Sequence, residues 1–134
     1  MSARPSAGVL DTCTYIDLPV LDAADLPTHP ELTAITLAEL HQGVSMAKDP
    51  FTRAARTEVL SEAAAAFEPL PFDADAAQLY GSLVALTLAA GRDPRPRRLD
   101  LMIAAIASAR DLPLYTRSPA DFKGLDDLLI VHAV

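Results

Sequence analysis

Four acidic residues, Asp11, Glu39, Asp100 and Asp121, could together carry chemistry, because each follows an apolar run or begins an expected helix. In a parallel α/β sheet, the positions just after the strands share one edge, and ligands bind at that edge. Residues far apart in the sequence would then form one carboxylate cluster. Clustered carboxylates need a cation to stay ionised, and oxygen ligands suit Mg²⁺ or Mn²⁺. The pattern therefore indicates a divalent-metal site and phosphate chemistry.

Each of these acids also has a local explanation. The run from Thr36 to Glu39 has the form of a capping box, in which Glu39 would occupy the third helical position. The run from Ser118 to Asp121 combines a cap residue, a proline and an acid. Asp11 would cap the short helix that follows it, and Asp100 would suit the dipole at a helix start. Capping does not explain why acids follow several different strands, so we favour a shared site.

The elements that would position these acids alternate between strands and helices. Strands are expected at residues 8–10, 32–35, 67–72, 112–115 and 128–131, and helices at 12–18, 37–47, 50–66, 74–90 and 99–110. Pro50 marks one helix start, and Gly91 marks one helix end. The last helix has an apolar stripe at helical spacing, made by Leu99, Ile103, Ile106 and Ala107. This alternation predicts an α/β fold with a central, mainly parallel sheet of about four to five strands, covered on both faces.

Composition fits one soluble domain. The chain has 134 residues, of which 51% are hydrophobic, and this is enough for a single core. The lone Cys13 excludes an internal disulfide framework, so we expect a cytoplasmic protein. No stretch reads as a signal peptide or a membrane span. The net charge of −7 argues against a nucleic-acid binder with a broadly basic surface, but not against a nuclease with a local metal site.

Other acidic or phosphate-binding sites fit the sequence less well. His29, His41 and His132 are scattered, so no zinc-ligand spacing is present. A haloacid-dehalogenase-type phosphatase needs a second Asp two residues after its nucleophile, and this chain has Cys13 there. A response-regulator receiver domain needs paired acids after its first strand, where only Asp11 occurs. The Gly-Lys-Ser/Thr stretch of a P-loop is also missing.

Four sequence motifs give the chain a specific resemblance. They are VLDTCTYI at Asp11, ITLAEL at Glu39, RRLDLMIAAIA at Asp100 and LYTRSPADF at Asp121. In this order, and over almost the whole chain, they resemble the PIN-domain ribonucleases, specifically the VapC toxins of type II toxin–antitoxin pairs. The resemblance implies a single PIN domain over residues 1–134, a three-layer α/β/α sandwich.

The resemblance also assigns roles to residues of the site. It implies that Asp11, Glu39 and Asp100 are the core metal-binding acids and that Asp121 is the more variable fourth catalytic acid. Thr12 follows the first acid, as in the family. Supporting positions near the fourth acid are Thr116 and Ser118. The family usually has Asn or Asp in place of Ser118, which is a poorer metal ligand, so direct binding of metal by Asp121 stays open.

Arginines near the acids are candidate contacts for RNA phosphates. Arg92, Arg95, Arg97 and Arg98 precede Asp100, and Arg117 precedes Asp121 in the sequence. They could hold the phosphate backbone beside the metal site, with an affinity that falls as salt rises. They could equally form a solvated loop, stiffened by prolines, that offsets the negative charge of the chain.

The implied function is hydrolysis of RNA by a metal-dependent endoribonuclease. Mg²⁺, or Mn²⁺, would activate a water that attacks phosphorus in a structured RNA such as tRNA or rRNA, leaving a 5′-phosphate and a 3′-hydroxyl. The family implies a homodimer and a VapB-like antitoxin, whose tail would enter the groove between residues 37–46 and helix 50–66 and present an Arg to the acids. A non-catalytic PIN-like binding module and a housekeeping PIN nuclease are the alternatives.

Overall fold

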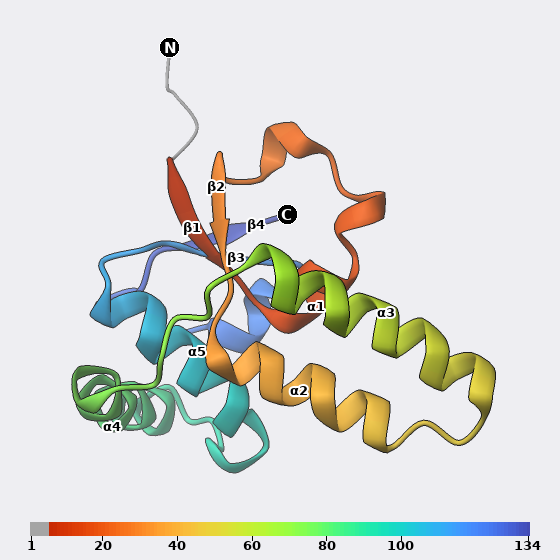
Figure 1. Cartoon of the computed structure of the whole chain (residues 1–134). Helices are drawn as coiled ribbons and strands as arrows, with labels where there is room; N and C mark the ends of the chain where they lie inside the picture. The colour runs from red at the N-terminus through yellow and green to blue at the C-terminus, as the bar shows by residue number, and fades with distance from the viewer. Residues whose placement is uncertain (1–5) are drawn as a thin grey trace.

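The computed structural model describes residues 6–134, which form a four-stranded sheet with helices on both faces (Figure 1). The strands are β1 (Ala7–Leu10), β2 (His29–Glu31), β3 (Leu114–Thr116) and β4 (Val131–Ala133). Their order is β2-β1-β3-β4, and every neighbouring pair is parallel. The predicted parallel sheet is therefore confirmed, with β1 and β3 at its centre.

Residues 6–134 also contain five α-helices, all of which lie between β1 and β3 in the sequence. They are α1 (Thr12–Ile16), α2 (Ala34–Ser45), α3 (Pro50–Ala66), α4 (Ala74–Ala89) and α5 (Arg98–Ala109). The side chain of Asp49 caps α3, whose first residue is Pro50, and Gly91 follows α4 with a φ of 74°. Both features confirm the expected boundaries of these two helices. In the described part of the chain, no helix is long and apolar enough to cross a membrane.

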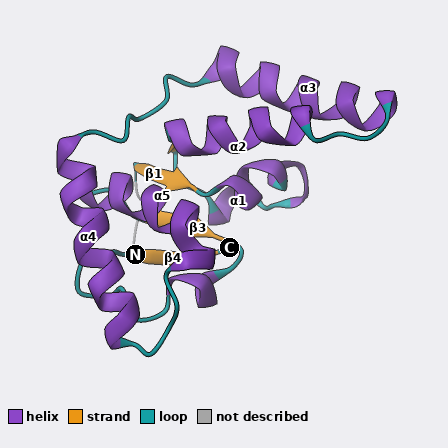
Figure 2. Ribbon diagram, turned by 90° about the horizontal axis from the view of Figure 1, so that it is seen from below, coloured by secondary structure: helices purple, strands orange, loops and turns teal. Residues whose placement is uncertain are grey.

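The core lies in two layers because side chains alternate across the sheet. Val9 and Leu114 point to one face and pack in the cluster that contains the buried residues of α4 and α5. Leu10 and Tyr115 point to the other face and pack with residues of α1, α2 and α3. Figures 1 and 2 show α2 and α3 side by side as a pair that projects from the sheet. This is the expected three-layer sandwich.

The second strand lies earlier than predicted. Residues 32–35 were expected to form it, but β2 ends at Glu31. Thr33 is instead the N-cap of α2, because its hydroxyl accepts a hydrogen bond from the Thr36 amide at 3.2 Å. The predicted loop at 17–30 accordingly ends in β2 at His29 and contains two short 3₁₀ turns.

Two other predicted strands also need correction. Residues 67–72 form no strand in the structure and pair only through a bridge between Thr33 and Leu70, because the prolines on either side of Leu70 have no N–H to donate. The last strand begins at Val131, not at residue 128, since residues 125–129 form a turn closed by backbone bonds to Leu125 O. Strand β3, predicted at residues 112–115, begins at Leu114, two residues later than predicted.

The apolar stripe predicted for the last helix is mostly correct. Ile103, Ile106 and Ala107 are fully buried, whereas Leu99 is 42% exposed. Leu99 lies in the first turn of α5, where the helix extends beyond the core. Asp100 also lies in this first turn, and it lines the same pocket as Asp11, which directly follows β1.

Candidate active site

The four predicted acids come together at one pocket. Asp11 follows β1 directly, Glu39 lies on α2, Asp100 lies in the first turn of α5, and Asp121 lies in the 3₁₀ turn η4 (Pro119–Phe122) after β3. All four line a cavity of about 800 Å³, together with Thr12 and Ser118. The shared edge of a parallel sheet thus places acids from four separate elements around one space.

Asp11 is the most constrained of these acids. It is only 5% exposed. Its Oδ1 accepts a bond from the Thr14 amide at 3.0 Å, which makes it the cap of α1 as predicted. Its Oδ2 accepts a bond from the Thr116 hydroxyl at 2.5 Å, and that hydroxyl accepts one from the Ser118 amide at 2.9 Å. These bonds fix the carboxylate while leaving lone pairs available toward the pocket.

Glu39 does not form the predicted capping box. Because Thr33 caps α2, Glu39 lies in the second turn of the helix and cannot reach the cap. Its Oε1 instead accepts a hydrogen bond from the Thr12 hydroxyl at 2.7 Å. The position of Glu39 is therefore explained by a contact between α1 and α2 at the pocket, and not by the end of its own helix.

Asp100 shows the electrostatic strain of the cluster. Burial, and then the charges of Asp121, Glu39 and Asp11, together raise the pKa of its carboxyl from 3.8 to about 6, while Arg97 opposes them. The four carboxylates are thus close enough to repel one another. A divalent cation in the pocket would relieve this repulsion.

Cys13 was not predicted as a site residue, yet it lines the same pocket. The pKa of its thiol is raised, mainly by burial and then by the negative charges of Asp11, Asp100, Glu39 and Asp17. The thiol therefore stays neutral at physiological pH. Its place two residues after Asp11 was visible in the sequence, but only the short helix α1 turns it toward the acids.

The acids face the pocket without forming a compact coordination sphere. Within residues 6–134, no group of three or more His, Cys, Asp or Glu side chains is arranged as a metal-ligand cluster. The donors are nevertheless hard carboxylate and hydroxyl oxygens, the type that Mg²⁺ and Mn²⁺ prefer. The donor chemistry fits these ions, and Glu39, Asp100 and Asp121 line the pocket as partly exposed side chains.

Ser118 and Asp121 also line the pocket. Ser118 precedes η4 but does not cap it with its side chain, contrary to the prediction, and Asp121 lies in the first turn as expected. The guanidinium of Arg92 donates to the Ala120 carbonyl at 2.7 Å. This bond ties the arginine-rich loop to the turn that carries the fourth acid.

The other arginines hold local structure. Arg95 forms an exposed salt bridge with Asp93 at 3.0 Å, and Arg97 donates to the Asp93 carbonyl at 3.1 Å. Arg98 donates to the carbonyl of Arg95 at 3.2 Å. Arg117 pairs with Asp17 at 3.0 Å. Each of these candidates has a structural partner, and none lines the acidic pocket in the described part of the chain.

Much of the remaining pocket wall is apolar, and the sequence analysis did not assign its residues individually. Its larger apolar side chains are Ile16 from α1, Leu40 from α2, Met46 just after α2, and Val59 from α3. Arg56 from α3 also lines it, with its guanidinium donating to the Gly43 carbonyl at 2.7 Å. The acidic end of the pocket therefore continues into the groove between α2 and α3, where an apolar segment could lie.

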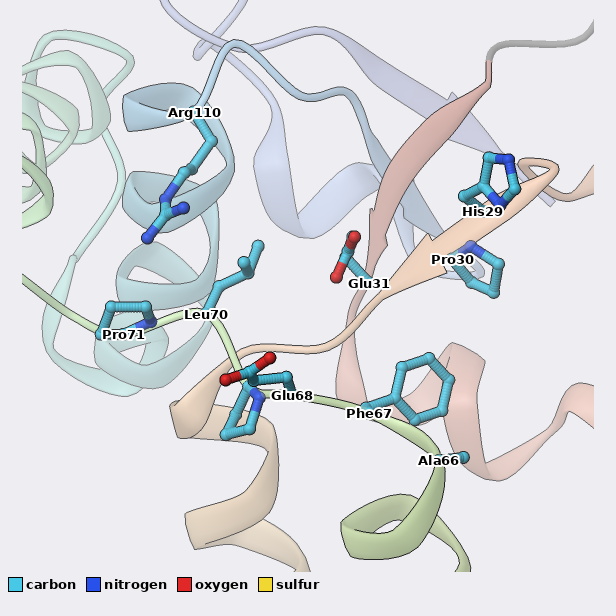
Figure 3. Close-up of a pocket in the computed structure, with 10 residues that line it drawn as sticks. His29, Pro30, Glu31, Ala66, Phe67, Glu68, Leu70, Pro71 and Arg110 are labelled. Atoms are coloured by element: carbon cyan, nitrogen blue, oxygen red, sulfur yellow. The ribbon is translucent and has the colours of Figure 1, made fainter.

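A second cavity, of about 790 Å³, holds none of the predicted site residues. Figure 3 shows that it lies between β2 and the segment that joins α3 to α4, with Glu31, Glu68 and Arg110 on different walls. Its volume is nearly the same as that of the acidic pocket, so volume does not identify the site. The convergence of acids and hydroxyls at the strand ends does.

Comparison with known proteins places the chain in a family. No family model matches it. It is 41% identical over 137 residues to ribonuclease VapC5 of Mycobacterium tuberculosis, covering 100% of this chain and 98% of that protein. The crystal structure of VapBC-5 from the same species, a member of the VapBC family of toxin–antitoxin systems, matches with a TM-score of 0.83 and 40% identity, covering 97% and 98% of the two chains. FitAcB from Neisseria gonorrhoeae matches with a TM-score of 0.71 and 26% identity, covering 92% and 94%.

A parallel α/β sandwich with acids at the carboxyl ends of its strands has the PIN-like fold of VapC structures. The identity over the full chain is decisive for the family. The chain belongs to the VapC ribonucleases, the toxins of VapBC toxin–antitoxin systems. The resemblance drawn from the four sequence motifs is thereby confirmed.

Proposed function

We propose that this VapC ribonuclease is a metal-dependent endoribonuclease whose active site is the pocket lined by Asp11, Glu39, Asp100 and Asp121. The observation that carries the proposal is the convergence of these four carboxylates, from four elements, on one pocket. The pKa of Asp100, raised to about 6, supports mutual repulsion that a cation would offset. Mg²⁺ is the expected ion, with Mn²⁺ as a close substitute.

The proposed metal ligands are Asp11, Asp100 and Glu39, with Asp121 as an accessory. A divalent cation here would lower the pKa of water and offset negative charge on the phosphate. The protein groups supply orientation: Thr14 and Thr116 hold the Asp11 carboxylate in place. In the proposed reaction a water oxygen bonds to phosphorus and the bond from phosphorus to the 3′ oxygen breaks. The 3′ oxygen takes up a proton, so the products are a 5′-phosphate and a 3′-hydroxyl.

RNA binding would depend on local charge, because the chain as a whole carries −7. Arg95, Arg97 and Arg98 remain the proposed phosphate contacts, since their loop leads directly into Asp100 and is largely exposed. Their local hydrogen bonds leave further donors on each guanidinium. If the Arg95→Ala and Arg97→Ala changes together leave RNA affinity and its salt dependence unaltered, these arginines only hold the loop.

We propose that the protein acts in the cytoplasm and that its protein partner is a VapB-like antitoxin. The solved relative VapBC-5 belongs to a toxin–antitoxin system. The apolar groove between α2 and α3 opens into the acidic pocket, and Met46, which lines it, is 65% exposed. An apolar segment ending in a basic side chain would suit both parts. A homodimer is proposed from the family alone.

The decisive test is cleavage of RNA by the purified chain. We expect tRNA or rRNA to be cut in Mg²⁺, with cleavage abolished by EDTA and restored by added Mg²⁺. The variants Asp11→Asn and Asp100→Asn should fold and lose most cleavage, while Asp126→Asn, an exposed acid outside the pocket, should keep it. Full activity of both pocket variants would refute the site.

The alternatives give different outcomes. RNA binding without cleavage in any divalent metal would favour a non-catalytic module. Cleavage without growth arrest on induced expression would favour a housekeeping nuclease. Growth arrest that requires Asp11 and is relieved by a co-expressed antitoxin would support the toxin.

A further inference from the structure

A line of hydroxyl groups leads from the interior of the protein to Glu39. The hydroxyl oxygens of Thr36 and Thr12 lie 3.0 Å apart, and the Thr12 hydroxyl donates to Oε1 of Glu39 at 2.7 Å. Thr36 is fully buried, whereas Thr12 and Glu39 are partly exposed and line the pocket. Thr36 and Glu39 lie one turn apart on α2, and Thr12 begins α1.

The direction of these bonds follows from proton counting. A hydroxyl carries one proton, and an ionised carboxylate only accepts. Since the proton of Thr12 goes to Glu39, Thr12 must accept from Thr36. The order is therefore from Thr36 to Thr12 to Glu39, and each bond polarises the next in a site of low dielectric.

Thr36 does not use its hydroxyl in the way usual for a helical threonine. Such a residue commonly donates to the carbonyl four residues earlier, as buried Thr87 does to the Leu83 carbonyl at 2.8 Å. The corresponding carbonyl for Thr36 belongs to Leu32, which accepts from the Leu70 amide at 2.9 Å. The Thr36 hydroxyl is thus directed across to α1 and toward the pocket.

We propose that Thr36 is a positioning residue for the cation site, acting through Thr12 on Glu39. By donating to Thr12, it fixes the direction in which Thr12 donates, so that Oε1 of Glu39 is held and Oε2 is left to face a cation. Residues behind a metal ligand act in this way by orienting it. The inference rests on the proposed function of the pocket as a divalent-metal site.

Two substitutions at Thr36 separate the effect of its hydroxyl group from the effect of its packing. Thr36→Val keeps the volume and removes the hydroxyl, whereas Thr36→Ser keeps the hydroxyl and removes a buried methyl group. Thr87→Val is the matched control, because it removes a buried helical hydroxyl away from the pocket. The measurements are Mn²⁺ affinity of the full chain by calorimetry and the melting temperature in EDTA.

We expect Thr36→Val to weaken Mn²⁺ binding about three- to tenfold, less than the roughly 10- to 100-fold typical of a residue that contacts the ligand directly. Thr36→Ser should bind Mn²⁺ like the wild type while melting at a lower temperature. Thr87→Val should leave affinity unchanged. In a Thr12→Val background, adding Thr36→Val should have no further effect on affinity, because the intermediate group is already missing.

The outcomes distinguish this inference from the proposed function. Equal Mn²⁺ affinity of Thr36→Val and wild type overturns the inference alone. So does an equal loss of affinity in Thr36→Val and Thr36→Ser, which indicates a packing effect. Mn²⁺ binding that depends on Thr36 in a chain that cuts no RNA overturns the proposed catalysis and keeps the inference. No Mn²⁺ binding by the wild type overturns both.

Discussion

The Asp100 carboxylate, a proposed metal ligand, should destabilise the folded protein when no metal is bound. Burial, and then the charges of Asp121, Glu39 and Asp11, raise its pKa from 3.8 to about 6. The protonated carboxyl is therefore favoured in the folded state. Its contribution to stability is fully present below about pH 4 and is lost as the pH rises through about 6. At neutral pH the charged Asp100 destabilises the metal-free protein, so Asp100→Asn should be more stable than the wild type.

The size of this effect follows from the pKa difference. The change from 3.8 to about 6 corresponds to roughly 3 kcal/mol between the two protonation states. Asp100 is only partly buried, so screening by solvent reduces the expected effect to about 1–2 kcal/mol. For a domain of this length, that change raises the melting temperature by about 3–8 °C. Asparagine keeps the shape of the side chain and removes its charge.

The assay is thermal unfolding in EDTA across pH 4 to 8, followed by circular dichroism. The melting temperature of Asp100→Asn minus that of the wild type should be near zero at about pH 4, grow up to about pH 6, and stay constant above it. Asp126→Asn, the exposed control, makes the same change in net charge outside the pocket. Added Mg²⁺ should then stabilise the wild type more than Asp100→Asn, because binding to the native state adds to its stability.

Two results would refute this reasoning. One is an Asp100→Asn variant that melts below the wild type at pH 7 in EDTA, which would mean that the carboxylate makes favourable contacts. The other is a gain that does not depend on pH or is equalled by Asp126→Asn, which would assign it to overall charge and not to the cluster.

Three further substitutions test other contacts. Thr116→Val removes the hydroxyl that donates to Asp11. It should lower the rate of RNA cleavage about 10-fold and the free energy of unfolding in urea by about 1–2 kcal/mol. An unchanged cleavage rate would contradict a positioning role for Thr116. Gly8→Ala would press a Cβ against the Tyr115 ring and should lower the free energy of unfolding by about 1–3 kcal/mol. An unchanged midpoint of urea unfolding would show that the ring can move aside freely. Arg92→Ala removes the hydrogen bond to the Ala120 carbonyl in the turn that carries Asp121, and should slow single-turnover cleavage about threefold. Arg110→Ala, which removes the same charge away from the acidic pocket, is the control. Equal cleavage rates of the two variants would show that the Arg92 bond does not position Asp121.

Local sequence signals predicted the long helices well. The Asp49-Pro50 pair and Gly91 fix helix ends through groups that lie within a few residues of each other, so α3 and α4 match their expected boundaries. The same kind of signal misled at Thr36, where a capping box was expected. Thr33, three residues earlier, also has a hydroxyl and takes the cap. Two overlapping cap patterns cannot be separated without knowing where the preceding strand ends.

Short strands were placed less well, because an apolar run does not say which of its residues will pair. Residues 67–72 and 128–131 are apolar enough for strands, but pairing needs a neighbour with matching free N–H and C=O groups. The first run meets the chain at the Thr33–Leu70 bridge only, and the second is mostly taken up by a turn. Both facts depend on residues distant in the sequence.

The sequence by itself determined the family and the α/β class, because its four ordered motifs carry the resemblance and the whole chain is 41% identical to ribonuclease VapC5. It also predicted Asp11, Glu39, Asp100 and Asp121, the four acids that the structure brings to one pocket. Only the tertiary structure decided what surrounds each acid. Hydrogen bonds such as that from Thr116 to Asp11 join residues 105 positions apart. Desolvation and repulsion at Asp100 likewise depend on three-dimensional distances, which parallel crossovers set and residue types alone do not.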